Sequence, residues 1–327
     1  MPRFSLLVLA AALAVAPVAH AQPAATMPAP RAHHALGYDP ARQRVILTAG
    51  STPVDSGRSF RFFDDLWEFD GARWTARPSS GREISGVRLA WDARRGRMLS
   101  FGGYWDGLAR APLRVHTSEG WITLHERTAV PAAEPGFAYD AKRDRYLVFG
   151  GSVSRGIVDD RTWEWRDTGW VALDIPAPPG RAAHAMAYDA KRGRTVVFGG
   201  IGGSVVGERP AVFGDTWEFD GTRWEQRDVQ GPSPRHSAGI TYDSKRGTIL
   251  LFGGSAPDGF AGDTWQWDGR EWKRLATDGP EPRAMAALAY DARRDRVVLF
   301  GGRKGYPDGD LGDTWEWDGA SWKRVVP

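Results

Sequence analysis

The chain has 327 residues, of which 42% are hydrophobic and 12% aromatic, and this is enough apolar material for a large folded core. Its formal net charge of +3, without any run of lysine or arginine, excludes a strongly basic nucleic-acid-binding protein. The absence of cysteine excludes disulfide bonds, thiolate nucleophiles and thiolate metal ligands.

Residues 1–21 are predicted to be a secretory signal peptide. Arg3 supplies the positive charge, and the apolar segment after it is too short to cross a bilayer. Ala19-His20-Ala21 fits a cleavage site, so we expect cleavage before Gln22. No later stretch is apolar enough to insert into a membrane, which predicts a periplasmic or secreted protein.

Residues 22–30 (QPAATMPAP) are predicted to be a disordered lead-in, because they are rich in proline and alanine.

Residues 31–327 then repeat one pattern six times at a spacing of about fifty residues. The first mark is an aromatic residue before a repeat aspartate: Tyr38-Asp39, Trp91-Asp92, Tyr139-Asp140, Tyr188-Asp189, Tyr242-Asp243 and Tyr290-Asp291. The second is a double glycine: Gly102-Gly103, Gly150-Gly151, Gly199-Gly200, Gly253-Gly254 and Gly301-Gly302, with Ala49-Gly50 in the first copy. The third is a tryptophan pair: Trp67/Trp74, Trp163/Trp170, Trp217/Trp224, Trp265/Trp272 and Trp315/Trp322, with only Trp121 in the second copy.

Each repeat predicts four strands whose chemistry changes in order. The first strand has small residues, which suit strands that crowd around an axis. The second is continuously apolar, as in residues 297–300, which predicts burial on both faces. The third alternates around its tryptophans, and the fourth is charged beyond its tryptophan, as in Trp322-Lys323-Arg324, which suits an outer edge.

Two kinds of connection separate the strands. The turns after each repeat aspartate and at each Asp-Gly are short, as expected for hairpins. The loops after the double glycines are long and dissimilar, and in a four-stranded meander they fall on one face, where binding usually occurs. Because the chain starts with a first strand and ends with a fourth, we expect no split blade and closure of blade 1 on blade 6.

The period, the double glycine and the spaced aromatic pair resemble the kelch repeat. This resemblance covers residues 31–327 and implies an all-β fold, a six-bladed β-propeller of four-stranded kelch blades. Bacterial exported kelch proteins that epimerise N-acetylneuraminate are similar in architecture and compartment. The central domain of galactose oxidase is similar too, but its copper chemistry needs a tyrosine crosslinked to cysteine, which this chain lacks. Function must therefore be argued from the site.

Four arginines open first strands, each eight residues before its repeat aspartate: Arg31, Arg181, Arg235 and Arg283. One interpretation is a cationic ring at the channel mouth that binds a carboxylate or an acidic sugar. The alternative is that each arginine pairs with a framework carboxylate such as Asp215, Asp263 or Asp313.

Two histidines are catalytic candidates. His34 and His184 lie five residues before their repeat aspartates, with His33 and His236 nearby. They could exchange protons or bind a metal, but no spacing defines a metal site, and polar lining of a wet channel is the alternative. We expect no metal and no cofactor.

Aromatic residues in the long loops are further ligand-binding candidates. Tyr104 and Trp105 lie in the second loop and Tyr306 in the last, where they could stack on sugar rings or prolines; alternatively, Trp105 covers the edge of an irregular blade. Asp308, Asp310 and Asp313 loosely resemble a calcium loop, with plain turn formation as the alternative.

Two functions are compatible with these residues. The first is a non-catalytic binding module, a monomer that binds a glycan, a peptide or a protein on its long-loop face. The second is a sugar-active enzyme such as a sialic acid epimerase or mutarotase, with the arginines on the carboxylate and a histidine in proton transfer.

Overall fold

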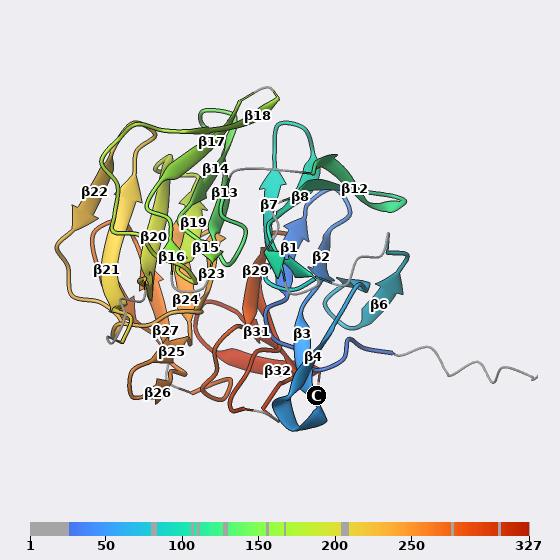
Figure 1. The fold of residues 1–327 in the computed structure, drawn as a ribbon. Coiled ribbons are helices and arrows are strands. Elements are labelled where there is room, and N and C mark those ends of the chain that lie inside the picture. Colours follow the sequence, from blue (N-terminus) through green and yellow to red (C-terminus); the bar gives the residue numbers. More distant parts are fainter. Residues whose placement is uncertain are drawn as a thin grey trace, which may run out of the picture.

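We describe the fold from a computed structural model (Figure 1). The structure describes residues 26–79, 84–105, 108–109, 112–126, 130–154, 157–166, 168–203, 209–275, 278–306 and 309–326. The predicted signal peptide and its cleavage site lie outside the described residues. Among the described residues, no helix combines the length and apolar character needed to cross a bilayer.

Six antiparallel four-stranded sheets account for most of the described chain. Blade 1 consists of β1 (Ala35–Asp39), β2 (Arg44–Thr48), β5 (Leu66–Phe69) and β6 (Trp74–Arg77). Blade 2 consists of β7 (Arg88–Asp92), β8 (Arg97–Phe101), β11 (Leu113–Thr117) and β12 (Gly120–His125). Blade 3 consists of β13 (Gly136–Asp140), β14 (Arg145–Phe149), β17 (Thr162–Arg166) and β18 (Gly169–Ala172).

The other three blades repeat this order. Blade 4 consists of β19 (Ala185–Asp189), β20 (Arg194–Ile201), β21 (Val212–Phe219) and β22 (Trp224–Arg227). Blade 5 consists of β23 (Gly239–Asp243), β24 (Thr248–Phe252), β27 (Thr264–Trp267) and β28 (Trp272–Arg274). Blade 6 consists of β29 (Ala287–Asp291), β30 (Arg296–Phe300), β31 (Thr314–Trp317) and β32 (Trp322–Val326).

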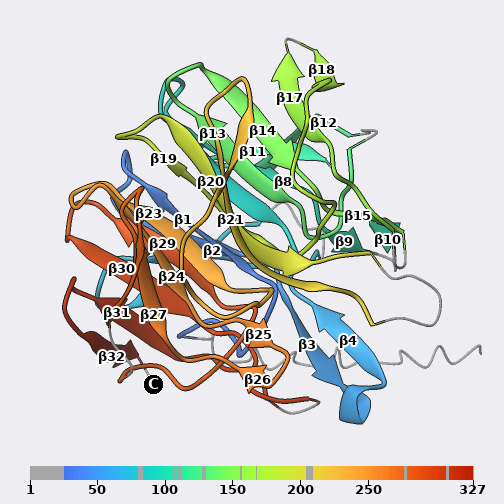
Figure 2. The ribbon, with the colours of Figure 1, turned by 90° about the vertical axis from the view of Figure 1, so that its left-hand side faces the viewer.

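In the part of the chain that the structure describes, the long loops carry four small ribbons, all on one side of the disc (Figure 2). They pair β3 (Ser51–Val54) with β4 (Ser59–Phe62), β9 (Tyr104–Trp105) with β10 (Leu108–Ala109), β15 (Ser152–Ser154) with β16 (Ile157–Val158), and β25 (Ser255–Ala256) with β26 (Gly259–Phe260). A short 3₁₀ turn, η1 (Asp55–Gly57), joins the first pair. We call this side the long-loop face and the opposite side the short-turn face.

The blades form a closed ring. Each innermost strand (β1, β7, β13, β19, β23 and β29) contacts the innermost strands of its two neighbours, and β1 packs against β29. The prediction of a six-bladed propeller is confirmed, and no blade is divided between the chain ends. Of the predicted lead-in, residues 26–30 are described, and Met27 packs against the core shared by blades 1 and 6.

Tryptophan links each regular blade to the one before it. The ring of the second tryptophan of a pair packs against a phenylalanine of the preceding blade, as Trp322 does edge-on against Phe252 at a centroid distance of 5.5 Å. Its indole N–H also donates to a third-strand threonine there, at 2.8–2.9 Å: Trp74 to Thr314, Trp224 to Thr162, Trp272 to Thr216 and Trp322 to Thr264. In blade 2 the position of this threonine is taken by Leu113, which pairs with Phe101 as Thr162 pairs with Phe149 in blade 3. The indole N–H of Trp170, in blade 3, accordingly has no partner among the described residues.

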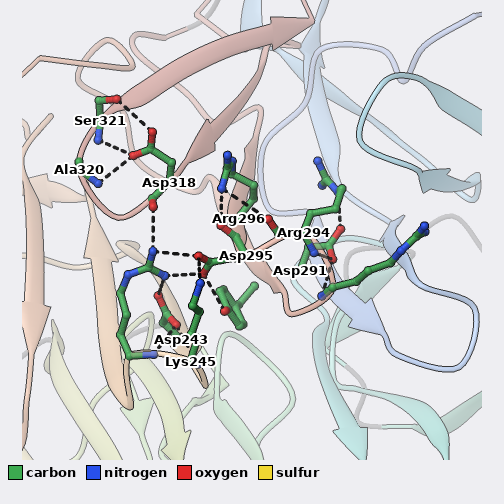
Figure 3. A network of polar contacts seen from close by, with 12 residues as sticks. Asp243, Lys245, Asp291, Arg294, Asp295, Arg296, Asp318, Ala320 and Ser321 are labelled. Atoms are coloured by element: carbon green, nitrogen blue, oxygen red, sulfur yellow. Dashed lines mark hydrogen bonds and ion pairs between the residues drawn. The ribbon is translucent and has the colours of Figure 1, made fainter.

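Arginine links the blades on the short-turn face. The six turn arginines, each three residues after a repeat aspartate, are Arg42, Arg95, Arg143, Arg192, Arg246 and Arg294. The first three and Arg246 reach a partner in the next blade, whereas the hydrogen bonds of Arg192 and Arg294 go to carboxylates of their own blade. Arg246, for example, binds Asp243 of its own blade and Asp295 of the next, both at 2.6 Å, and donates to the Asp318 carbonyl at 2.8 Å; Figure 3 shows these partners.

The Asp-Gly turns need glycine because of these arginines. Four of their glycines, Gly71, Gly221, Gly269 and Gly319, have φ between 97° and 103°. A Cβ atom at any of them would lie 2.0–2.6 Å from a turn arginine of another blade. Any other residue would therefore strain the backbone and displace the arginine side chain packed against it.

Candidate functional site

The channel opens on the long-loop face through a ring of six residues with left-handed backbone. These residues, each six before a repeat aspartate, are His33, Gly86, Glu134, Ala183, Ser237 and Met285, with φ between 50° and 77°. Five backbone hydrogen bonds of 2.7–3.3 Å join consecutive members of the ring across the blade boundaries. The sixth link, from the Glu134 N–H to the Gly86 carbonyl, is missing among the described residues, so the ring is interrupted between blades 2 and 3.

Below this ring the channel narrows. Six large apolar residues, each three before a repeat aspartate, line it together: Leu36, Leu89, Phe137, Met186, Ile240 and Leu288. We call this layer the apolar constriction. It separates a cavity of about 140 Å³ under the long-loop mouth, here called the vestibule, from a second cavity on the short-turn side.

Arg88 is the cation that faces the vestibule. It lies at the first position of its inner strand, where the other blades have only alanine or glycine: Ala35, Gly136, Ala185, Gly239 and Ala287. Within the described residues its side chain donates one hydrogen bond, to the neighbouring Val87 carbonyl at 3.3 Å, and no carboxylate lies within 4.0 Å of it. Burial lowers the pKa of Arg88, against the opposing charge of Glu134.

Glu134 and His33 supply the opposite charge and a proton carrier. The His33 Nδ1 and Glu134 Oε1 atoms are 3.1 Å apart, and both side chains are about a quarter exposed or less, at 24% and 22%. Burial alone would raise the pKa of Glu134, but the hydrogen bond and charge of His33, followed by Arg88 and His236, lower it to about 2. The vestibule thus presents a guanidinium on one side and an ionised carboxylate on another.

The catalytic candidates His34 and His184 border the vestibule but are buried between blades. Their rings pack edge-on against Phe300 and Phe149, at centroid distances of 5.3 and 5.4 Å. Burial, and then the charge of Arg31, lower the pKa of His34 to about 3; burial, and then Arg181, lower that of His184 far below its usual value. Both imidazoles are therefore neutral at physiological pH, and their packing favours a structural role.

The four arginines predicted as a ligand-binding ring occupy the framework instead. Arg31, Arg181, Arg235 and Arg283 are 0–2% exposed, and none of them lines the vestibule. Each forms a two-pronged pair with an aspartate two residues before the first tryptophan of its blade: Asp65, Asp215, Asp263 and Asp313, respectively. The geometry follows the framework alternative, and we call these residues the frame arginines.

The pair in blade 6 shows how completely a frame arginine is used. Arg283 binds the Asp313 oxygens at 2.6 and 3.0 Å and donates to the carbonyls of Gly301 and Glu281 at 3.1 and 2.9 Å. The Trp315 indole donates to Asp313 at 2.7 Å. Burial alone would raise the pKa of Asp313, but Arg283 holds it below its usual range.

The aromatic candidates lie at different places on the long-loop face. The Tyr104 ring lies over Gly86, 3.4 Å from where a Cβ would be, and burial, with Glu134 next, raises its pKa to about 12. Tyr306 is 61% exposed, 6.5 Å from the Phe60 ring of blade 1, and its hydroxyl donates to the Gly57 carbonyl. The backbone of Trp105 forms β9 with Tyr104, and its side chain is outside the described part.

The acidic loop of blade 6 is engaged by arginines. Asp310 binds Arg303 at 2.6 Å and Asp313 binds Arg283, while Asp308 lies outside the described residues. Within the described ranges, no three histidine, aspartate or glutamate side chains come together as a metal site.

Sequence reasoning missed Arg88 and Glu134. The signal for Arg88 was present, since it is the one long side chain at a position that is otherwise alanine or glycine. Glu134 had no such signal, because its position holds a different residue in every blade and is identified only by its left-handed backbone.

Comparison with known proteins agrees with this architecture. No curated protein matches the chain. The family model of the KLHDC2/KLHL20/DRC7 Kelch-repeats domain matches residues 136–326, more than half of the chain and all of blades 3 to 6. The chain therefore belongs to the kelch-repeat family of β-propellers.

Proposed function

We propose that this protein is an exported, non-catalytic binding module that recognises a carboxylate-bearing ligand at the long-loop mouth of its channel. The observation that supports this most is Arg88, a guanidinium that faces the vestibule without a carboxylate within 4.0 Å in the described part of the chain. A guanidinium binds a carboxylate with two parallel hydrogen bonds, and this ion pair is stronger where water is excluded.

Glu134 narrows the class of ligand further. Its carboxylate is ionised, is held by His33, and can accept a hydrogen bond from a ligand on another side of the same cavity. A ligand that fits both groups has a carboxylate next to a hydroxyl or amide N–H. Acidic sugars and peptide segments both have this combination.

The size of the vestibule limits what enters it. A volume of about 140 Å³ is well below the ~300–1,000 Å³ of sites that enclose a whole small ligand. Only one acidic group enters, and the rest of the glycan, peptide or protein lies on the rim. Tyr104 beside the mouth and Tyr306 farther out supply aromatic surface there.

The compartment and the assembly state belong to the same proposal. The predicted leader supports a periplasmic or secreted protein, and we expect a monomer. N-terminal sequencing of the exported chain should find Gln22 as its first residue, and light scattering should give the mass of one copy. A retained leader would contradict export.

The direct test is a screen of acidic and neutral glycans and peptides with the purified protein, followed by titration of the best acidic ligand. We expect Arg88→Gln to weaken its affinity at least about tenfold, since a charge-assisted pair is lost. Arg73→Gln is the matched control, because Arg73 is 81% exposed and far out on blade 1. Equal affinity of Arg88→Gln and wild type would refute the assignment.

A second function is supported by the His33–Glu134 pair. A carboxylate and an imidazole 3.1 Å apart, beside a guanidinium, are the groups that an acid–base isomerisation of an acidic sugar requires. This protein would then be a carbohydrate epimerase or mutarotase. Exchange NMR between the anomers of N-acetylneuraminate decides the matter: acceleration that Glu134→Gln abolishes supports the enzyme, and an unchanged exchange rate excludes it.

A further inference from the structure

The short-turn face contains a second cavity, of about 460 Å³, on the other side of the apolar constriction. Each blade contributes the aromatic residue before its repeat aspartate to the wall: Tyr38, Trp91, Tyr139, Tyr188, Tyr242 and Tyr290. We call this cavity the aromatic funnel. Its volume falls within the ~300–1,000 Å³ range of small-molecule sites, and it lies opposite the vestibule discussed above.

The hydroxyl groups in the funnel wall are largely committed to the scaffold. The Tyr188 hydroxyl accepts the Lys142 N–H of the preceding blade, and the Tyr242 hydroxyl accepts the Lys191 N–H, both at 3.1 Å. Tyr290 donates to Asp295 at 3.0 Å. What these residues offer a ligand is therefore the carbon surface of rings whose positions are fixed, over an apolar floor.

A basic residue follows two positions after the repeat aspartate in five of six blades, and all five are exposed at the rim of the funnel: Arg94, Lys142, Lys191, Lys245 and Arg293. Two of them are neutralised by the next blade. Lys245 binds Asp295 at 2.7 Å, as Figure 3 shows, and Arg94 binds Asp144 at 2.8 Å.

Blades 3 and 4 differ because the blade after each of them has glycine, Gly193 or Gly247, at the position where Asp144 and Asp295 neutralise the other two. The Lys142 side chain lies against Gly193, and Lys191 lies against Gly247. No carboxylate lies within 4.0 Å of either ammonium group in the described residues. Two consecutive blades thus place unneutralised positive charge at the rim, next to Tyr188 and Tyr242 of the wall.

The geometry points to a second ligand site on the short-turn face: the aromatic funnel binds a small amphipathic anion. An aromatic or short alkyl group enters the funnel, and its carboxylate, sulfonate or phosphate is held by Lys142 and Lys191 at the rim. Apolar burial supplies affinity, and the two lysines select the anion over its neutral counterpart.

The test uses 1-anilinonaphthalene-8-sulfonate, whose fluorescence increases in apolar sites, titrated into the purified protein. We expect saturable binding that decanoate displaces at least about tenfold better than decanol, which has the same alkyl chain without the charge. The double variant Lys142→Glu/Lys191→Glu should weaken the probe at least about tenfold, because attraction becomes repulsion.

The matched control is Lys273→Glu/Lys323→Glu, which changes the net charge equally at exposed positions of β28 and β32. It should bind the probe within about twofold of wild type. Three outcomes would overturn the proposal: no saturable binding, equal competition by decanol and decanoate, or equal loss in both double variants. Thermal unfolding of each variant checks that the probe reports on folded protein.

Discussion

Blades 1, 4, 5 and 6 differ from blades 2 and 3 in where their charged residues near the channel mouth lie. In the first group a frame arginine is buried, pairs with an aspartate and donates to backbone carbonyls. Blades 2 and 3 have Ile84 and Ala132 at that position, and their charged residues Arg88 and Glu134 face the channel instead. The backbone ring is also interrupted between these two blades.

This difference separates scaffold from site. A charge that recurs at one register in several blades, as the frame arginines do, finds its partners within its own blade and holds that blade together. Arg88 occurs once, at a position that is alanine or glycine in the other blades, has no carboxylate within 4.0 Å among the described residues, and is available to a ligand. The following changes test this division, beginning with the largest expected effect.

Asp313→Ala should remove about 3–5 kcal/mol from the free energy of unfolding, because Arg283 would remain buried without a counter-charge. Equilibrium unfolding in urea measures it. Asp159→Ala in blade 3 is the matched control: it loses the same kind of indole bond, from Trp163, but leaves Arg161, which is 49% exposed. We expect its loss to be at least about 2 kcal/mol smaller; equal losses would show that the frame arginines are not special.

Thr264→Val tests the tryptophan links and should cost about 1–3 kcal/mol, since the buried Trp322 N–H loses its acceptor. Thr195→Val is the same substitution at a buried threonine whose hydroxyl has no partner among the described residues. It should be neutral or stabilising, within about 0.5 kcal/mol of wild type or above it. Denaturation midpoints of the two variants should therefore move apart; a common shift would argue against the links.

His34 predicts a pH dependence. Its folded-state pKa of about 3 lies below the unfolded value of 6.5, so the unfolded chain takes up the proton first as the pH falls. The stability that depends on this histidine being neutral is therefore fully present above pH 6.5 and is lost as the pH falls. Between pH 7.5 and 5.5 the free energy of unfolding should decrease by about 1.4 kcal/mol for this reason. In urea unfolding, the free energy of unfolding of His34→Gln should therefore decrease by that much less than the wild-type value over this pH interval. Parallel pH curves for variant and wild type would contradict the buried neutral imidazole.

The sequence predicted the scaffold well because the scaffold repeats. Six copies of the aromatic-aspartate pair and five double glycines defined the blade number, and the small-to-apolar-to-charged gradient identified inner and outer strands. The loop face followed from loop lengths, and the bridges from Ala32 to Ser51 and from Ala284 to Arg303 show the long loops starting beside the channel mouth.

The site was harder to predict because one left-handed residue decides which side chains face the channel. The frame arginines precede that residue by two positions, and the backbone turn sends them into the blade rather than to the axis. Arg88 follows it by two positions and faces the vestibule. The turn residue is His, Gly, Glu, Ala, Ser or Met in the different blades, so no residue type marked it in the sequence.

The most direct test of the account is to measure the affinity of one acidic ligand, selected by the binding screen, for wild type, Arg88→Gln and Arg235→Gln under conditions where all three are folded. We expect Arg88→Gln to keep wild-type stability and to lose at least about tenfold in affinity. Arg235→Gln should lose stability while its folded fraction binds with wild-type affinity. The reverse result, with affinity lost through Arg235 and retained without Arg88, would contradict the division between scaffold and site.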